Sequence, residues 1–128
     1  MQVFLTKWMS RYARREKISR ASLCEAVTRA ERELIDADLG GGLIKQRVAR
    51  AGKGRSGGYR TILAYRRFGR ADFVFGFAKS ALENIDRDQL ETLQDIAAIW
   101  LTADERKIAN GLQNGELEEV PYDSEEDE

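Results

Sequence analysis

Lysine and arginine side chains are concentrated between residues 43 and 80. This stretch contains ten of them and only one acidic residue, Asp72. Guanidinium and ammonium groups bind phosphate, because their positive charge and N–H donors match its oxygens. Most of the strand-forming residues lie in the same stretch, so we expect the cations to stand on a sheet. The pattern predicts a surface that binds a polyanion, in particular RNA. Its cations are Lys45, Arg47, Arg50, Lys53, Arg55, Arg60, Arg66, Arg67, Arg70 and Lys79.

The two parts of the chain carry opposite charge. Residues 1–80 hold 18 lysines and arginines against 7 acids, whereas residues 81–128 hold 3 against 15, so the net charge of −1 hides a strong asymmetry. A basic part of this kind points to an anionic partner. The acidic part is interpreted either as a solvated tail or as a segment that folds back and competes for the basic surface.

Composition excludes several kinds of chemistry. The chain has no histidine, which removes His-ligated metals and Ser-His-Asp catalysis, so neither a metal nor a cofactor is predicted. A single cysteine, Cys24, excludes an internal disulfide and suits a reducing cytoplasm. No apolar run approaches the roughly 18 residues of a membrane span, and we see no signal peptide. We therefore expect a cytoplasmic protein with one folded domain, residues 1–114, and an acidic, disordered tail, residues 115–128.

The amino-terminal part is predicted to form a strand and two helices. Alternation in residues 2–6 indicates the strand. Apolar residues then recur at helical spacing, and the opposite face carries cations that are either solvated or in contact with the ligand. A second helix is predicted to begin at a cap, Ser19 or Ser22, and to run to about Asp38, where three glycines stop it.

Three strands are predicted in the basic stretch. Residues 43–50, 59–67 and 71–78 have strand patterns and short connections, which favour an antiparallel meander. In the first of them, Ile44 and Val48 point to one face while Lys45 and Arg47 point to the other.

Glycines and aromatic residues mark two further features of this stretch. The loop 51–58 has four glycines and two cations, so it can approach phosphate closely, but it lacks the triphosphate-loop spacing. Phe73, Phe75 and Phe77 fall at period two and should share one face. They are interpreted either as core beneath the helices or as a platform on which bases stack.

The last part is predicted to be helical. A helix opens near Asp86 and Asp88, with apolar residues spaced to pack on the sheet. Thr102 and Glu105 form a capping-box pattern for a short helix that ends at Asn110 and Gly111. The predicted fold is therefore α+β: strand, helix, helix, three antiparallel strands and helix, with a small sheet packed against the N-terminal helices and a C-terminal helix.

This order of elements, with three sequence motifs, resembles the RelE-type toxins of bacterial toxin–antitoxin systems, and especially their HigB-like branch. The motifs are IKQRVAR, SGGYRTILAY and FVFGFAKS. The resemblance extends to about Asn110. It implies a small α+β protein that cuts mRNA in the ribosomal A site and so inhibits translation. It also implies a cognate antitoxin that covers the basic face.

The resemblance also implies which residues are catalytic. Lys45 and Arg47 fall where the family carries cations on its first meander strand. Arg60 matches the arginine that holds the scissile phosphate, and Lys79 lies in the basic motif after the last strand. The RelE archetype has an arginine and then a catalytic tyrosine beyond this motif, whereas this chain has Ser80 there and no tyrosine nearby.

These residue types suit RNA cleavage to a cyclic phosphate. Without histidine, a lysine takes the proton of the 2′-hydroxyl when neighbouring positive charge favours its neutral form. Arginine forks stabilise the charge that develops on the phosphorane. We assign proton transfer to Lys45 and phosphate stabilisation to Arg60 and Arg47, with Lys79 assisting. RNA contacts are predicted for Arg50, Lys53, Arg55, Tyr59 and Arg66.

Other functions stay open at this point. The cations alternatively bind only backbone phosphate or the antitoxin, without cleavage. The toxin fold also hosts non-enzymatic inhibitors of protein targets such as gyrase. A DNA-binding regulator is the least favoured class, because no recognition-helix pattern with an adjacent turn glycine is present.

Overall fold

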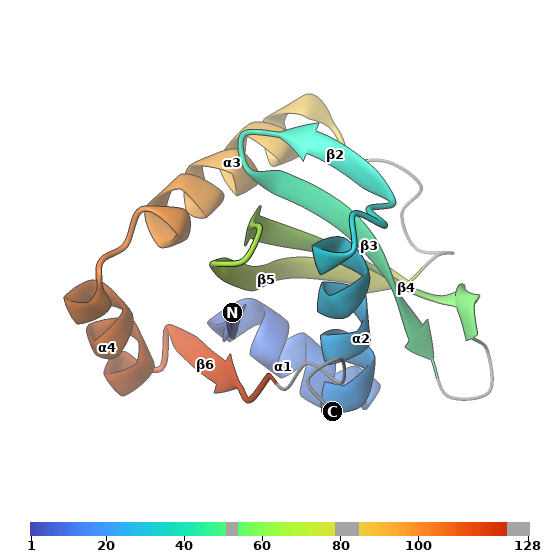
Figure 1. Cartoon of the computed structure of the whole chain (residues 1–128), viewed down its shortest axis with the longest axis horizontal. Coiled ribbons are helices and arrows are strands. Elements are labelled where there is room, and N and C mark those ends of the chain that lie inside the picture. The colour runs from blue at the N-terminus through green and yellow to red at the C-terminus, as the bar shows by residue number, and fades with distance from the viewer. Residues whose placement is uncertain (51–53, 79–84, 123–128) are drawn as a thin grey trace.

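A computed structural model describes residues 1–50, 54–78 and 85–122 (Figure 1). Helices and strands occur together around one mixed sheet, so the prediction of an α+β fold is confirmed. The elements are β1 (Gln2–Thr6), α1 (Lys7–Glu16), α2 (Arg20–Glu31), β2 (Ala37–Gly40), β3 (Leu43–Arg50), β4 (Gly54–Arg66), β5 (Arg70–Ala78), α3 (Arg87–Leu101), α4 (Glu105–Asn114) and β6 (Leu117–Val120).

The sheet contains the predicted meander and three further strands. Its order is β2-β3-β4-β5-β1-β6 among the described residues. The pairs β3–β4 and β4–β5 are antiparallel, as predicted, and β4 begins at Gly54 rather than at residue 59. The first strand, β1, lies parallel to β5 and antiparallel to β6. The basic stretch therefore occupies the middle of the sheet.

Helices cover both faces of the sheet. On one face, α1 and α2 pack on a core that includes Met9, Val27, Val48 and Phe73. On the other face, α3 packs on Leu43, Ile62 and Ala64 from β3 and β4, and α4 packs near Phe4 of β1. We call these the α1/α2 face and the α3/α4 face. Alternate residues of each strand point to opposite faces, so the two cores are built from alternating positions.

The second helix is shorter than predicted. Ser19 caps it by accepting a hydrogen bond from the backbone N–H of Ser22, which selects the earlier of the two predicted caps. The helix ends at Glu31 instead of near Asp38. Glu33 adopts a left-handed φ of 64°, and the chain then turns back as β2 along β3. Leu34, which lies within the predicted helix, is 57% exposed.

The two helices after the meander begin close to their predicted starts. Asp86 and Gln89 form a reciprocal capping box at the start of α3. The next helix, α4, is capped by Asp104 rather than Thr102. It runs through Gly111 to Asn114, and Gly115, with a φ of 78°, is its C-cap. Within the described parts of the chain, no helix is long and apolar enough to cross a membrane.

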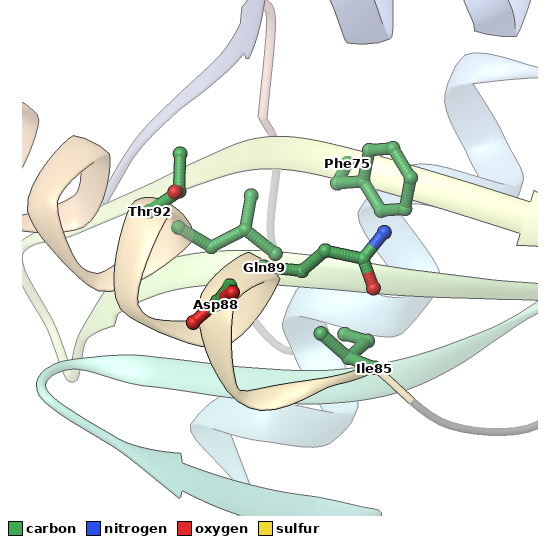
Figure 2. A pocket seen from close by; sticks show the side chains of 6 residues that line it. Phe75, Ile85, Asp88, Gln89 and Thr92 are labelled. Atoms are coloured by element: carbon green, nitrogen blue, oxygen red, sulfur yellow. The ribbon is translucent and has the colours of Figure 1, made fainter.

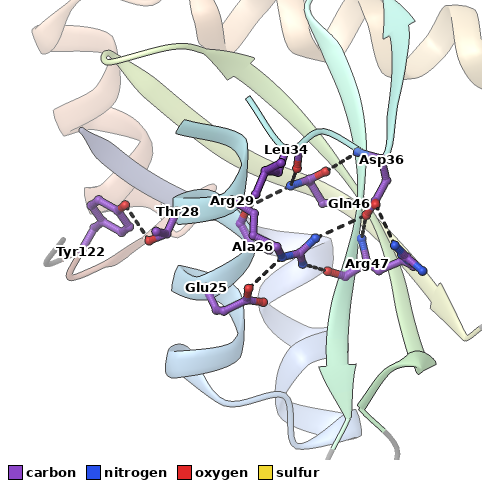
Figure 3. A network of polar contacts seen from close by, with 9 residues as sticks. All are labelled: Glu25, Ala26, Thr28, Arg29, Leu34, Asp36, Gln46, Arg47 and Tyr122. Atoms are coloured by element: carbon purple, nitrogen blue, oxygen red, sulfur yellow. Dashed lines mark hydrogen bonds and ion pairs between the residues drawn. The ribbon is translucent and has the colours of Figure 1, made fainter. Parts of the chain in front are cut away.

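The acidic tail does not begin at residue 115. Leu117–Val120 pairs with β1, with Leu117 and Val120 buried in the cores of opposite faces. Beyond the strand, the hydroxyls of Tyr122 and Thr28 lie 2.8 Å apart, which ties the chain to α2 (Figure 3). Two buried apolar side chains thus hold a segment whose charge suggested disorder. The predicted disorder from residue 123 onward lies outside the described residues.

Replacing Leu117 by alanine tests this correction. Removing a buried leucine side chain leaves a cavity, so we expect the free energy of unfolding to fall by about 2–4 kcal/mol. Glu116→Ala is the matched control, because this exposed side chain lies one residue earlier and its loss should change stability by less than about 0.5 kcal/mol. Urea unfolding measures both. Equal effects would show that β6 is not part of the cooperative fold.

Candidate functional site

Arg47 and Arg60 stand side by side on neighbouring strands. They are direct partners across β3 and β4, and Arg60 is in turn the partner of Phe77 on β5. Lys45, two residues before Arg47 on β3, is the partner of Ile62 on β4. Ile62 and Phe77 belong to the core beneath α3. Their cross-strand partners Lys45 and Arg60, and Arg47 beside Arg60, therefore lie on the α3/α4 face. The pairing of the meander therefore brings three of the predicted site residues together.

Arg60 is held with an unused hydrogen-bond donor. Its side chain is half-buried, and its Nη1 atom is buried without an acceptor among the described residues. Leaving a buried donor unsatisfied costs about 1–3 kcal/mol, and more for a charged group. Native structures contain few such groups, and a catalytic role or a bound ion is one explanation for them. This donor is therefore free to bond to an acceptor from outside the described part of the chain.

Arg47 is fixed by Asp36, which follows α2 (Figure 3). One carboxylate oxygen of Asp36 accepts from the Arg47 backbone N–H at 2.7 Å, and the other accepts from its guanidinium at 3.1 Å. Burial alone would raise the pKa of Asp36, but these two hydrogen bonds and the charges of Arg47 and Arg29 lower it overall. Arg29, itself buried, also donates to the backbone carbonyl of Arg47. The guanidinium of Arg47 remains partly exposed beside Arg60.

Gln46 fixes the segment that carries Asp36 from within the protein core. Its side chain is fully buried, donates to the carbonyls of Ala26 and Leu34, and accepts from the backbone N–H of Asp36. These bonds place the segment after α2 against β3. Sequence reasoning did not identify Asp36 or Gln46. The available signal was a glutamine at an inward position, between Ile44 and Val48 on their face of the strand.

Asp36→Asn is expected to destabilise the fold by about 1–3 kcal/mol at pH 7, because it removes a carboxylate that accepts two charge-assisted bonds. The folded-state pKa of Asp36 is lowered, so its contribution is present above the ordinary aspartate pKa and is lost as the pH falls through the folded value. Urea unfolding at pH 7 and near pH 3 measures the difference. Asp95→Asn, at an exposed position of α3, is the control. A loss that is the same at both pH values would contradict the assignment.

Two predicted RNA contacts lie on the opposite face of the sheet. Tyr59 is 2% exposed in the core of the α1/α2 face, where its hydroxyl donates to the carbonyl and carboxylate of Glu16. Burial raises the pKa of this hydroxyl. The guanidinium of Arg50 lies over the Tyr59 ring, 5.6 Å from its centroid. Successive residues of a strand point to opposite faces, so Tyr59 cannot share a surface with Arg60.

Arg66 is also separate from the arginine pair. It lies six residues along β4 from Arg60, which corresponds to roughly 20 Å of extended strand. Its Nη1 donates to the carbonyl of Leu101 at 2.8 Å, at the C-terminal end of α3. Cations stabilise that end of a helix by pairing with its free carbonyls. The structure therefore gives Arg66 a role in holding α3.

The remaining predicted cations are described only in part. Lys45 is half-buried on the α3/α4 face. Arg55 lies within β4, but its side chain is outside what the structure describes. Lys53 and Lys79 fall outside the described residues altogether. Their assigned roles stay predictions.

The three phenylalanines of β5 do not share one face. Ile62 pairs with Phe75 and Leu63 with Phe73, so an extra residue, Val74, interrupts the alternation as a bulge. Phe73 is consequently buried on the α1/α2 face, whereas Phe75 and Phe77 lie in the core of the other face, with ring centroids 6.1 Å apart. Phe75 is only partly buried, and it is the diagonal neighbour of Arg60, which forms with Arg47 what we call the arginine row.

Two comparisons accompany this geometry. A family model described as RelE toxin of RelE / RelB toxin-antitoxin system matches residues 1–120. The match includes β6 and every element that carries the site. The curated proteins compared with the chain include no match.

Among the described residues, no group of three or more cysteine or acidic side chains is arranged to hold a metal ion.

Proposed function

The chain belongs to the RelE toxin family, and we propose that it is the toxin of a bacterial toxin–antitoxin pair that stops translation by cutting mRNA on the ribosome. The family's description includes an antitoxin, so a cognate antitoxin protein is the implied partner. We further propose that the toxin acts in the cytoplasm, where ribosomes and mRNA are found.

The observation that carries this proposal is the buried, unsatisfied Nη1 of Arg60 beside Arg47. A phosphate of an RNA strand supplies the missing acceptor, and two adjacent guanidinium groups match its oxygens. In cleavage, the 2′-oxygen forms a bond to phosphorus while the bond from phosphorus to the 5′-oxygen breaks. The phosphorane carries more negative charge than the starting phosphate, so donors already held in place lower the barrier.

Proton transfers complete the proposed reaction. Lys45 takes the proton of the 2′-hydroxyl, and the leaving 5′-oxygen receives a proton from water, a step in which Lys79 assists. Lys45 stands on the same face as Arg47, two residues away, which suits a role at the same phosphate. Asp36 does not contact RNA in this scheme. It acts as a positioning residue that holds Arg47.

One sequence observation favours a second candidate. Residues 80–86, SALENID, contain neither the arginine nor the tyrosine that follows the last strand in the RelE archetype. A toxin without cleavage activity that inhibits a protein target such as gyrase is consistent with this difference. In that case the arginine row binds an acidic surface of the target instead of RNA.

A reconstituted translation reaction separates the two candidates. Purified protein is added with mRNA, with and without ribosomes, and the mRNA ends are mapped by primer extension. We expect new mRNA ends only when ribosomes are present, together with arrested protein synthesis. Intact mRNA and unchanged translation, combined with loss of DNA supercoiling in a gyrase assay, would reject the proposed activity in favour of the second candidate.

A further inference from the structure

A pocket of about 280 Å³ opens beside the arginine row, between β5 and the first turns of α3 (Figure 2). Phe75 contributes its ring from the sheet, and Ile85 and Leu93 add apolar walls. Three polar side chains of α3 complete the lining: Asp88, Gln89 and Thr92. The pocket is thus mostly apolar with a few polar groups at one side, which is the usual character of a small-ligand site.

The pocket lies one residue pair away from the proposed phosphate position. Phe77 is the direct partner of Arg60, and Phe75 is two residues before it, so Arg60 and Phe75 form a diagonal pair across β4 and β5. Diagonal pairs in antiparallel sheets have Cα atoms roughly 7–8 Å apart. A phosphate held by Arg60 therefore leaves its neighbouring base within reach of the Phe75 ring.

The amide of Gln89 has a fixed orientation in this pocket. Its oxygen accepts the backbone N–H of Asp86 at 3.1 Å as part of the capping box of α3. The amide nitrogen is then the group turned toward Phe75, as Figure 2 shows. It donates no hydrogen bond within the described part of the chain. The pocket consequently offers an aromatic surface together with a donor of known direction.

We propose that this pocket binds one nucleobase of the RNA strand whose phosphate lies on Arg60 and Arg47. The base stacks against Phe75 and accepts a hydrogen bond from the Gln89 amide. A stacking surface without a polar group is tolerant of every base, whereas a fixed donor favours bases that present an acceptor to it. The pocket therefore selects among bases at one position of the substrate. This inference rests on the proposed function, because it requires RNA at the arginine row.

Binding of short oligonucleotides that cannot be cleaved tests the proposal. The probes are 2′-O-methyl hexanucleotides of adenine, cytosine or uracil, and a hexamer of the same backbone without bases. Fluorescence anisotropy gives each dissociation constant. Stacking on one aromatic ring is expected to tighten binding roughly 10-fold, so the wild-type protein should prefer the base-bearing probes to the abasic one by about that factor.

Two substitutions address the pocket directly. Phe75→Leu keeps an apolar side chain but removes the ring, so the preference over the abasic probe should fall below about 3-fold. Gln89→Glu keeps an oxygen for the capping box, since glutamate serves there as well as glutamine. It replaces the donor by an acceptor, so the uracil probe should lose more affinity than the adenine and cytosine probes, whose exocyclic amino groups are donors. A melting curve checks that each variant is folded.

Matched controls separate the pocket from the phosphate site. Gln113→Glu makes the same charge change at an exposed position of α4 and should weaken all probes equally and slightly. Arg60→Ala should weaken all probes strongly, including the abasic one.

The outcomes distinguish this inference from the proposed function. No binding of any probe by the wild-type protein would overturn the base pocket, whereas the proposed function is overturned only if the translation reaction with ribosomes also leaves the mRNA intact. Equal binding of abasic and base-bearing probes, with a loss for Arg60→Ala, would leave RNA binding in place and overturn the base pocket. The base pocket is also overturned if Gln89→Glu changes the affinities for the probes in the same way as Gln113→Glu does. It is likewise overturned if Phe75→Leu changes only the affinity for the purified antitoxin. In the latter case an antitoxin side chain fills the pocket.

Discussion

Replacing Arg60 by alanine is expected to lower the rate of ribosome-dependent mRNA cleavage at least 100-fold. Of Arg47 and Arg60, only Arg60 has a buried donor without an acceptor among the described residues. A donor already aimed at the reacting phosphate acts mainly on the charge that develops in the transition state, and removing one such donor typically costs about 100- to 1000-fold in rate. Arg60→Lys keeps the charge but loses the planar fork, so it should recover only part of the activity.

The same substitution should not weaken the fold. A buried charged donor without a partner is unfavourable, so its removal is expected to leave the free energy of unfolding unchanged or slightly raised. Arg106→Ala, at an exposed position of α4, controls for the lost charge and should keep full cleavage activity. Single-turnover cleavage and urea unfolding are measured on the same preparations. If Arg60→Ala cleaves like Arg106→Ala, the phosphate does not bind where we place it.

Local patterns in the sequence were sufficient for much of the sheet. Alternation in residues 43–50 and the short connections predicted the meander, and the pairing of β3 with β4 then placed Arg47 opposite Arg60. The acidic start of α3 and the cap at Ser19 were also local signals, because a cap bonds to a backbone N–H only three residues away.

The errors arise where contacts distant in sequence decide the structure. The bulge at Val74 turns Phe73 away from Phe75, and alternation alone cannot reveal an inserted residue. Charge predicted a solvated tail, but burial of Leu117 and Val120 against other elements holds β6 in the sheet. Tyr59 is a similar case. Its position in a basic stretch suggested contact with RNA, but its side chain is buried and its hydroxyl donates to Glu16.

Asp72 is an unfavourable side chain in the core. It lies in the middle of β5, opposite Phe4 of β1 and Ala64 of β4. It is fully buried, and neither carboxyl oxygen has a hydrogen-bond partner in the described part of the chain. Nearby Arg70 donates instead to the carbonyls of Trp100 and Ala103 at the end of α3. Burial raises the pKa of Asp72 to about 8, although the positive charge of Arg70 opposes the shift.

A raised pKa makes the fold sensitive to alkaline pH. Below the ordinary aspartate pKa of about 4, the folded and unfolded chains both carry a neutral Asp72, and no charge is buried. Between that value and about 8, the unfolded chain loses the proton while the folded chain keeps it, so stability falls as the pH rises. Each pH unit in this interval removes up to about 1.4 kcal/mol. Above pH 8 both states are ionised, and this dependence ends.

Replacing Asp72 by asparagine should therefore stabilise the protein by roughly 3–5 kcal/mol at pH 8 and have little effect near pH 4.5, because asparagine has the same shape and never ionises. The stability of the variant relative to the wild type should rise steadily between these values. Urea unfolding at pH 4.5, 6 and 8 measures the difference, and Asp95→Asn shows the response of an exposed aspartate. A difference that does not change with pH would mean that Asp72 is already ionised in the fold. Arg70 would then have to stabilise the buried negative charge of Asp72 in addition to donating to Trp100 and Ala103.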